Sequence, residues 1–242
     1  GQDGIVAFLA GSYSLPTRAV SAIFNDEEIP LISAYALHPD ITKGDFTFRN
    51  GFLGTVEGKG AAYTAVKLLK AKKIAIIVSD NDFGTTLTQG FETYMKGHPE
   101  SKIVSIQKYP MSEKDFKPYL TKMKASNPDL VFFSGYYFQV APALKQAKDM
   151  GITVPFMGEQ GTDSPKTAEI GGKAAEGLII VTNLNRDDKR KFVQEFLSTY
   201  RKRHKIEPDM VGASGYDAFM LLANAIKQAK TTDGTEIGRA HV

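Results

Sequence analysis

The chain alternates short apolar runs with longer stretches in which apolar residues recur with a helical period. The run Ile74-Ala75-Ile76-Ile77-Val78 is apolar at successive positions, which is typical of a parallel strand covered on both faces. Similar runs predict strands over 5–10, 30–33, 73–78, 102–108, 130–134, 155–157 and 177–182.

Four stretches between or after these runs place their apolar side chains on one helical face. The four stripes are Tyr119, Leu120 and Met123; Val140, Leu144 and Ala147; Phe192, Val193, Phe196, Leu197 and Tyr200; and Leu221, Leu222, Ala225, Ile226 and Ala229. Because predicted strands alternate with predicted helices, the sequence indicates an α/β fold with mostly parallel sheets.

Two segments are candidates for crossings between lobes. Residues 43–60 contain five glycines around one short strand-like run at 46–49. Residues 183–188 form a polar break after the last predicted strand. The length of 242 residues allows either one large domain or two lobes.

The amino-acid composition excludes several classes of function but says little about the fold. With 42% hydrophobic and 24% charged residues, the chain is typical of a globular protein. A net charge of +3 is too small to predict a nucleic-acid partner. No apolar run approaches the roughly 18–20 residues that span a bilayer. The lack of cysteine excludes disulfides, thiolate catalysis and cysteine-ligated metal sites.

The common catalytic motifs are also missing. A phosphate-binding loop ending at Gly58 and Lys59 would need a glycine where Leu53 stands. A serine-hydrolase elbow at Ser214 would need a glycine where Tyr216 stands. The histidines are far apart along the chain and indicate surface positions rather than a metal centre. We therefore predict no enzyme, no catalytic residue, no metal and no cofactor.

The segments that follow the predicted strands are rich in small, hydroxyl and aromatic residues. In open α/β sheets, ligands bind outside the carboxyl ends of the strands. Ser14 lies near the start of a predicted helix, where backbone N–H groups favour an anion. For any single serine, a helix cap is the simpler interpretation. Together these segments predict a pocket for a small, partly apolar solute that carries a carboxylate.

A set of short segments along the whole chain resembles the sequence of a known family. They are Ile29-Pro30-Leu31-Ile32-Ser33, Pro39-Asp40-Ile41-Thr42, Phe48-Arg49, Lys73-Ile74-Ala75-Ile76-Ile77, Phe83-Gly84, Asp115-Phe116, Asn127-Pro128-Asp129-Leu130-Val131, Gly135-Tyr136-Tyr137, Gln146-Ala147, Gly151, Pro155-Phe156-Met157-Gly158, Asp163-Ser164-Pro165, Ala174-Ala175-Glu176-Gly177 and Tyr216-Asp217-Ala218. Over residues 1–236 the chain resembles the periplasmic solute-binding proteins of the branched-chain amino acid type, the leucine/isoleucine/valine-binding family.

The resemblance implies a clamshell of periplasmic binding protein type I, in which each lobe is a mostly parallel sheet flanked by helices. The first lobe would comprise 1–52 and 183–236, and the second lobe 53–182. Hinge closure would hold a small amino acid, carboxylate or amide for the membrane permease of an ABC importer. The implied location is periplasmic or extracellular, with or without a lipid anchor. The alternative is the ligand-sensing domain of a receptor with the same fold.

In the first lobe, the resemblance implies three contacts with a solute carboxylate. Ser14 matches a serine that helps to hold this group. Tyr35 and Ala36 fall on the segment whose backbone does the same, whereas Leu37 replaces a threonine that binds the carboxylate.

In the second lobe, Tyr136 matches a tyrosine that lines the site, and Phe83 stands where a tyrosine is usual. Gln160 occupies the position of the acid that pairs with the ligand ammonium, and Glu159 is adjacent. Losing a charge-assisted hydrogen bond costs about 1.5–3 kcal/mol, so a plain α-amino acid is disfavoured if Gln160 alone faces the ammonium. The other interpretation is that Glu159 supplies the charge.

Both ends of the chain differ from the family pattern. The chain begins at Gly1 without an initiator methionine, and the expected opening strand, opening helix and signal peptide are missing. One set of codons for 236–242 reproduces a common sequencing-adapter sequence. We therefore expect a chain truncated at both ends, with 237–242 as a non-native tail, and leave this tail out of the fold prediction.

Overall fold

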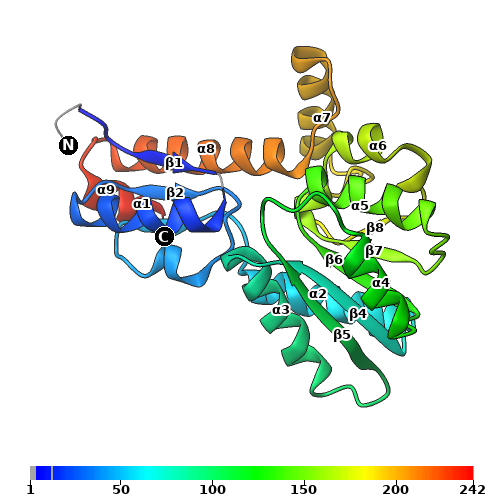
Figure 1. Ribbon diagram of the computed structural model, residues 1–242. Coiled ribbons are helices and arrows are strands. Elements are labelled where there is room, and N and C mark those ends of the chain that lie inside the picture. Colours follow the sequence, from blue (N-terminus) through cyan, green and yellow to red (C-terminus); the bar gives the residue numbers. More distant parts are fainter. Residues whose placement is uncertain (1–3, 12, 242) are drawn as a thin grey trace. The chain divides into compact units, whose positions relative to one another are not determined.

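The computed structural model describes residues 4–11 and 13–241, and the chain forms two compact units. One unit comprises Gly1–Gly54 with Val211–Val242, and the other comprises Thr55–Met210. Each unit contains a parallel sheet with flanking helices, so the predicted α/β class is confirmed (Figure 1).

The segment 183–210 was predicted in the first lobe, but in the structure it belongs to the second unit. Arg186 explains this assignment. Its Nη2 lies 2.7 Å from Oδ1 of Asp163 and donates to the carbonyl oxygen of Pro208 at 3.0 Å. Thr182 Oγ1 donates to the other oxygen of Asp163 at 2.7 Å. These bonds tie both ends of the segment to the second unit.

The first unit is built on three parallel strands in the order β1-β2-β3. The strands are β1 (Phe8–Ala10), β2 (Leu31–Ser33) and β3 (Thr47–Arg49). Its helices are α1 (Ser14–Asp26), the 3₁₀ turn η1 (Pro39–Thr42), α8 (Met210–Ala229) and α9 (Gly234–His241). The strand-like run at 46–49 is therefore a strand, and β1 is shorter than predicted.

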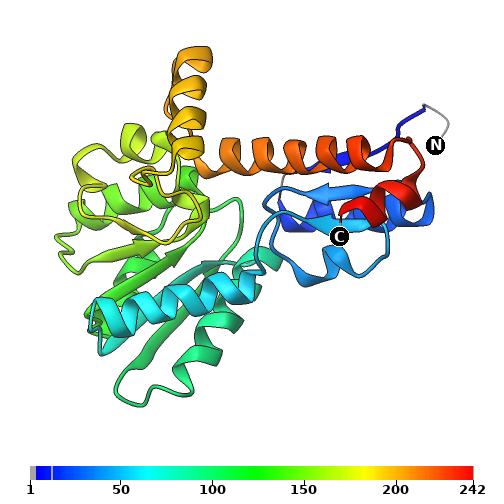
Figure 2. The same ribbon diagram turned by 180° about the vertical axis from the view of Figure 1, so that it is seen from behind.

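Alternate residues of β1 and β2 face opposite layers of helices. On one face, the ring of Phe8 stacks on Phe24 of α1, with 4.4 Å between the ring centroids. On the other face, Ile32 packs in a buried cluster with Ala218 and Leu222 of α8. Figure 2 shows the second of these layers from behind, with α8 and α9 beside the strands.

Residues 237–241, which the fold prediction left out, continue α9. Ile237 is 1% exposed and belongs to the same buried cluster as Ile32. Hence the structure includes part of the predicted tail in the packing of the first unit.

The second unit contains a five-stranded parallel sheet in the order β5-β4-β6-β7-β8. The strands are β4 (Lys73–Ser79), β5 (Lys102–Tyr109), β6 (Leu130–Ser134), β7 (Phe156–Gly158) and β8 (Ile179–Ile180). The helical segments are α2 (Gly54–Tyr63), the π-helix η2 (Thr64–Leu68), α3 (Asp82–Met95), α4 (Lys117–Ala125), α5 (Tyr137–Asp149), η3 (Gln160–Thr162), α6 (Pro165–Gly171), η4 (Gly172–Ala174) and α7 (Lys191–His204).

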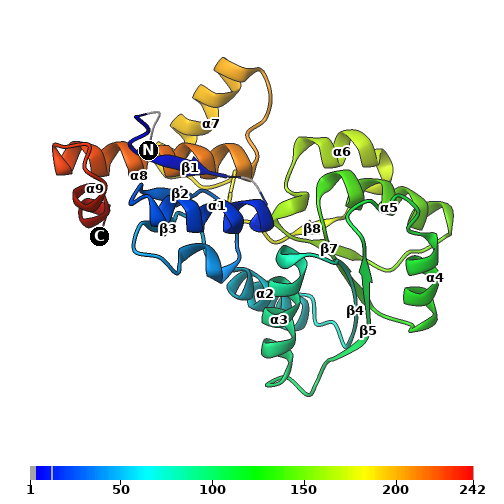
Figure 3. The same cartoon turned by 60° about the vertical axis from the view of Figure 1, so that its left-hand side comes forward.

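The apolar run in β4 supplies both faces of this sheet. Ala75 and Ile77 join a cluster with residues of α4 and α5, whereas Ile74, Ile76 and Val78 join a cluster with residues of α2 and α3. Figure 3 shows the two pairs of helices on either side of the β4 and β5 strands. The double burial explains why the run has no polar alternation.

Two glycines allow α2 and α3 to approach at backbone distance. A Cβ built on Gly58 would overlap the backbone of Leu87, and one built on Gly90 would overlap the backbone of Thr55. In contrast, a Cβ on Gly60, also in α2, would meet no atom within 4 Å. The helix pair therefore depends on Gly58 and Gly90 but not on Gly60.

We expect Gly58→Ala to lower the free energy of unfolding by about 1–3 kcal/mol, because the methyl group would force two backbones apart. Gly60→Ala is the matched control, and it should be neutral or stabilising by up to about 1 kcal/mol through helix propensity. Urea denaturation measures both values. Equal effects of the two substitutions would contradict the close packing.

Candidate functional site

The predicted site residues of the second unit come together at the carboxyl edge of its sheet. Phe83 lies in the first turn of α3, after β4, and Tyr136 is the residue before α5, after β6. Glu159 and Gln160 follow β7 directly. Because these strands are parallel, their carboxyl ends share one edge, which is where α/β sheets bind ligands.

Aromatic rings form a stack at this edge. The rings of Phe83 and Tyr136 are 5.3 Å apart between centroids and inclined by 20°. Tyr136 also stacks on Phe138, at 5.5 Å and 8°. Phe83 and Tyr136 are buried, whereas Phe138 is 40% exposed. Phe138 belongs to the aromatic-rich segment 135–139 that follows a predicted strand, but it is not among the predicted site residues.

Glu159 is turned into the interior of the second unit. Its side chain is 0% exposed, and its Oε1 accepts the backbone N–H of Gly135 at 2.9 Å. Its Oε2 accepts the backbone N–H of Gly161 at 2.5 Å and so caps η3. Burial raises the pKa of Glu159 to about 8, although both N–H groups act to lower it. This carboxyl joins the loops that leave β6 and β7.

A second buried acid, Glu57, lies beside the same turn. Its Oε1 accepts the backbone N–H of Gln160 at 3.0 Å, and both residues are 3% exposed. Burial, followed by the charge of Glu159, raises the pKa of Glu57 well above its ordinary value. Glu57 is not among the predicted site residues. The available signal was a single acid among the small residues of 54–62.

In the first unit, the structure brings together Ser14 and Leu37. Ser14 is the first residue of α1 and is 3% exposed, and its hydroxyl accepts the backbone N–H of Leu37 at 3.2 Å. Ala36 is buried next to Leu37, and Tyr35 is partly exposed. The four predicted residues of this unit therefore lie where a helix start meets the loop after β2.

Arg49 fixes the loop that carries Ala36 and Leu37. Its guanidinium donates to the carbonyl oxygens of Ala36 and His38, at 3.4 and 2.9 Å, and to Thr42 Oγ1 at 3.0 Å. Partial burial lowers the pKa of Arg49. The three acceptors replace the water that the guanidinium loses on burial. Arg49 carried the family resemblance without a role, and the structure gives it one.

The residues at the two strand edges, taken unit by unit, offer different chemistry. The first unit offers a hydroxyl at a helix N-terminus, which suits an anion. The second unit offers stacked rings, which suit an apolar or aromatic body. In the described residues, no cluster of three metal-binding side chains occurs, and no helix is long and apolar enough to cross a membrane.

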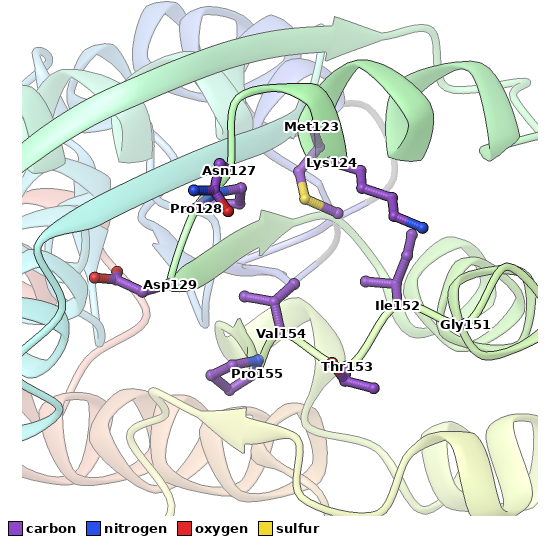
Figure 4. Close-up of a pocket in the computed structure, with 10 residues that line it drawn as sticks. All are labelled: Met123, Lys124, Asn127, Pro128, Asp129, Gly151, Ile152, Thr153, Val154 and Pro155. Carbon is purple, nitrogen blue, oxygen red and sulfur yellow. The ribbon is translucent and has the colours of Figure 1, made fainter.

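A separate groove of about 340 Å³ lies at the opposite edge of the second sheet. It is formed by the loops that enter β6 and β7, and Figure 4 shows Met123, Ile152 and Val154 around it with Lys124 at its rim. It contains none of the predicted site residues, so the carboxyl edge remains the candidate site.

Arg49→Lys should lower the free energy of unfolding by about 1–3 kcal/mol, because a lysine cannot reproduce the planar fork that donates to Ala36, His38 and Thr42 at once. The control is Lys43→Ala. Lys43 forms an exposed ion pair with Asp40 at 2.8 Å, and its loss should cost less than about 1 kcal/mol. Both are measured by urea denaturation, and a loss for Arg49→Lys no larger than that of the control would refute the role of Arg49.

Comparison with known proteins relates this arrangement to one family. A family model described as periplasmic binding protein matches residues 1–241. The leucine-specific-binding protein of Salmonella typhimurium is 29% identical over 204 residues, which cover 83% of this chain and 55% of that protein. The chain thus spans about half the length of the curated relatives that it matches.

Solved structures show the same architecture. The branched-chain amino acid transporter substrate binding protein LivJ from Streptococcus pneumoniae, in complex with isoleucine, is 26% identical with a TM-score of 0.91, covering 99% of this chain and 68% of that one. A solute binding protein of an ABC transporter from R. palustris, in complex with benzoate, is 21% identical with a TM-score of 0.88, covering 96% and 66%. The second likeness shows the fold alone.

Proposed function

The chain belongs to the periplasmic binding protein family, and from this premise we propose that it is the solute-binding component of an ABC importer. The observation that supports this proposal most directly is the grouping of Phe83, Tyr136 and Gln160 at the carboxyl edge of one parallel sheet. We propose a periplasmic or extracellular location, a membrane permease as the partner, and no enzymatic activity.

The solute in this proposal is a small apolar carboxylate without an ammonium group. In the first unit, Ser14 and the start of α1 suit a carboxylate, and in the second unit the ring stack of Phe83, Tyr136 and Phe138 suits an apolar body. Gln160 supplies a neutral amide, which cannot pair with a buried ammonium as an acid would.

The hydrogen bonds of Glu159 support this solute class over an amino acid. An acid that recognises an ammonium must turn an oxygen toward the solute. Both oxygens of Glu159 instead accept backbone N–H groups, from Gly135 and Gly161. The competing interpretation is that the solute is a leucine-like amino acid. It is supported by the similarity to a leucine-specific-binding protein.

A thermal-shift comparison of leucine with isocaproate, which is leucine without its amino group, tests the proposal. A ligand at about 100 times its Kd adds about 2.7 kcal/mol to the free energy of unfolding and shifts the midpoint by several degrees. We expect a shift with isocaproate but not with leucine. A shift with leucine alone would refute the solute class and keep the binding function, whereas no shift with any carboxylate, amino acid or amide would refute both.

Gln160→Glu should reverse this selectivity. A charge-assisted hydrogen bond contributes about 1.5–3 kcal/mol, so leucine affinity should rise at least about tenfold, and the added charge should weaken isocaproate binding. Titration calorimetry measures both affinities. The control, Gln89→Glu, makes the same charge change at an exposed position of α3. If leucine affinity does not change in Gln160→Glu, this position does not face the ammonium site.

A further inference from the structure

Two carboxyl groups are buried beside the turn that carries Gln160. Glu57 comes from the first turn of α2 and Glu159 from the end of β7, and they are 3% and 0% exposed. Between them they accept three backbone N–H groups, from Gly135, Gly161 and Gln160. The course of the turn after β7 is therefore set by two acids.

The surroundings of this pair provide no compensating cation in the described part of the chain. The charge that acts on Glu57 is that of Glu159, and the other influences on the two carboxyls are burial and backbone N–H groups. Tyr109 of β5 is also affected, because burial and then the charges of Glu159 and Tyr136 raise its pKa. The facing helix α3 carries an acid, Asp82, in its first turn.

Two buried carboxylates without a cation cannot both be ionised at low cost. Glu159 has N–H donors on both oxygens, which stabilise its ionised form. Glu57 has one donor on Oε1, whereas its buried Oε2 has no hydrogen-bond partner among the described residues. An ionised, unpartnered oxygen costs more than a protonated one, so the proton belongs on Glu57.

We propose that Glu57 is a positioning residue, which holds the turn of Gly158–Thr162 through the backbone of Gln160 and does so only while the Glu57–Glu159 pair retains a proton. Loss of that proton places two like charges behind the turn and displaces Gln160. The proposal concerns the stability of the second unit directly. Its consequence for solute binding rests on the proposed function.

The direction of the pH effect follows from the raised pKa values. The folded protein keeps protons that the unfolded chain releases near the ordinary carboxyl pKa, so stability falls as the pH rises above about 4.5. The loss continues through the pKa of Glu159, which is about 8. The turn should keep its geometry while Glu57 holds its proton and lose it only at the alkaline pH at which both carboxyls are ionised.

Glu57→Gln tests the proposal, because glutamine has the shape of a protonated glutamate and keeps an oxygen for the N–H of Gln160. The midpoint of thermal unfolding without ligand is measured at about pH 6, 7.5 and 9. We expect the wild-type midpoint to fall over this range and that of Glu57→Gln to fall at least about 2 °C less. The control Glu92→Gln changes an exposed acid of α3 and should follow the wild type.

Parallel curves for the wild type and Glu57→Gln would overturn the proposal. Failure of Glu57→Gln to fold at about pH 6, where the wild type folds, would also overturn it, because a protonated Glu57 is replaced by its closest neutral mimic. The wild-type pH series needs no variant, and a midpoint that does not fall between about pH 6 and 9 would be a third contradiction.

The binding arm uses isocaproate as the probe. Its affinity for the wild type should fall at least about tenfold once the pH is high enough to ionise both carboxyls, and its affinity for Glu57→Gln, which keeps a neutral group at position 57, should stay within about threefold. Glu57→Ala, which removes the acceptor, should weaken binding throughout the range. If the midpoints behave as expected but isocaproate does not bind at any pH, the proton-sharing pair stands and the proposed solute fails. If isocaproate binds with a pH-independent affinity, the positioning role fails.

Discussion

At the carboxyl ends of parallel strands, some backbone N–H groups have no partner in a neighbouring strand. The rest of the second unit depends on how these groups are satisfied. Each strand must release its chain at the same edge, and each departing loop presents donors that no neighbouring strand can accept. Side chains accept them here. Asn81 accepts the N–H of Gly84, and Gln139 accepts that of Tyr136 at 3.3 Å. Glu159 and Glu57 do the same for the turn after β7.

Because these backbone N–H groups need acceptors, residues with a structural role lie next to residues proposed to bind the solute. Glu159 satisfies backbone donors, and Gln160 beside it is the neutral residue of the proposed solute site. In the first unit, Arg49 holds the carbonyl groups of the loop while Ser14 accepts one of its N–H groups. In both units, a strongly polar side chain fixes a loop whose backbone or next residue is the candidate contact. Sequence position alone does not separate these duties.

The sequence predicted well whatever depends on hydrophobic periodicity. The apolar run at 74–78 became a central strand with both faces covered, because burial on two sides needs no alternation. It predicted poorly what depends on long-range contacts. The direction of the Glu159 side chain and the burial of Glu57 arise from partners 24 and 103 residues away in sequence. Of the apolar residues predicted on one face of α7, only Leu197 is buried in the described helix. The segment is attached to the second unit by the ion pair of Arg186 with Asp163 and not by this apolar face.

The exposed ring of Phe138 has a spectroscopic consequence. The sequence contains no tryptophan, so its ultraviolet emission comes from tyrosine. Phe138 lies at the accessible end of a ring stack that continues through Tyr136 to Phe83. An indole placed there by Phe138→Trp would be the single such chromophore in the chain, and its emission would report on the polarity at the edge of the stack without background. The same ladder of rings that offers a surface for an apolar solute thus provides a position for an intrinsic optical reporter.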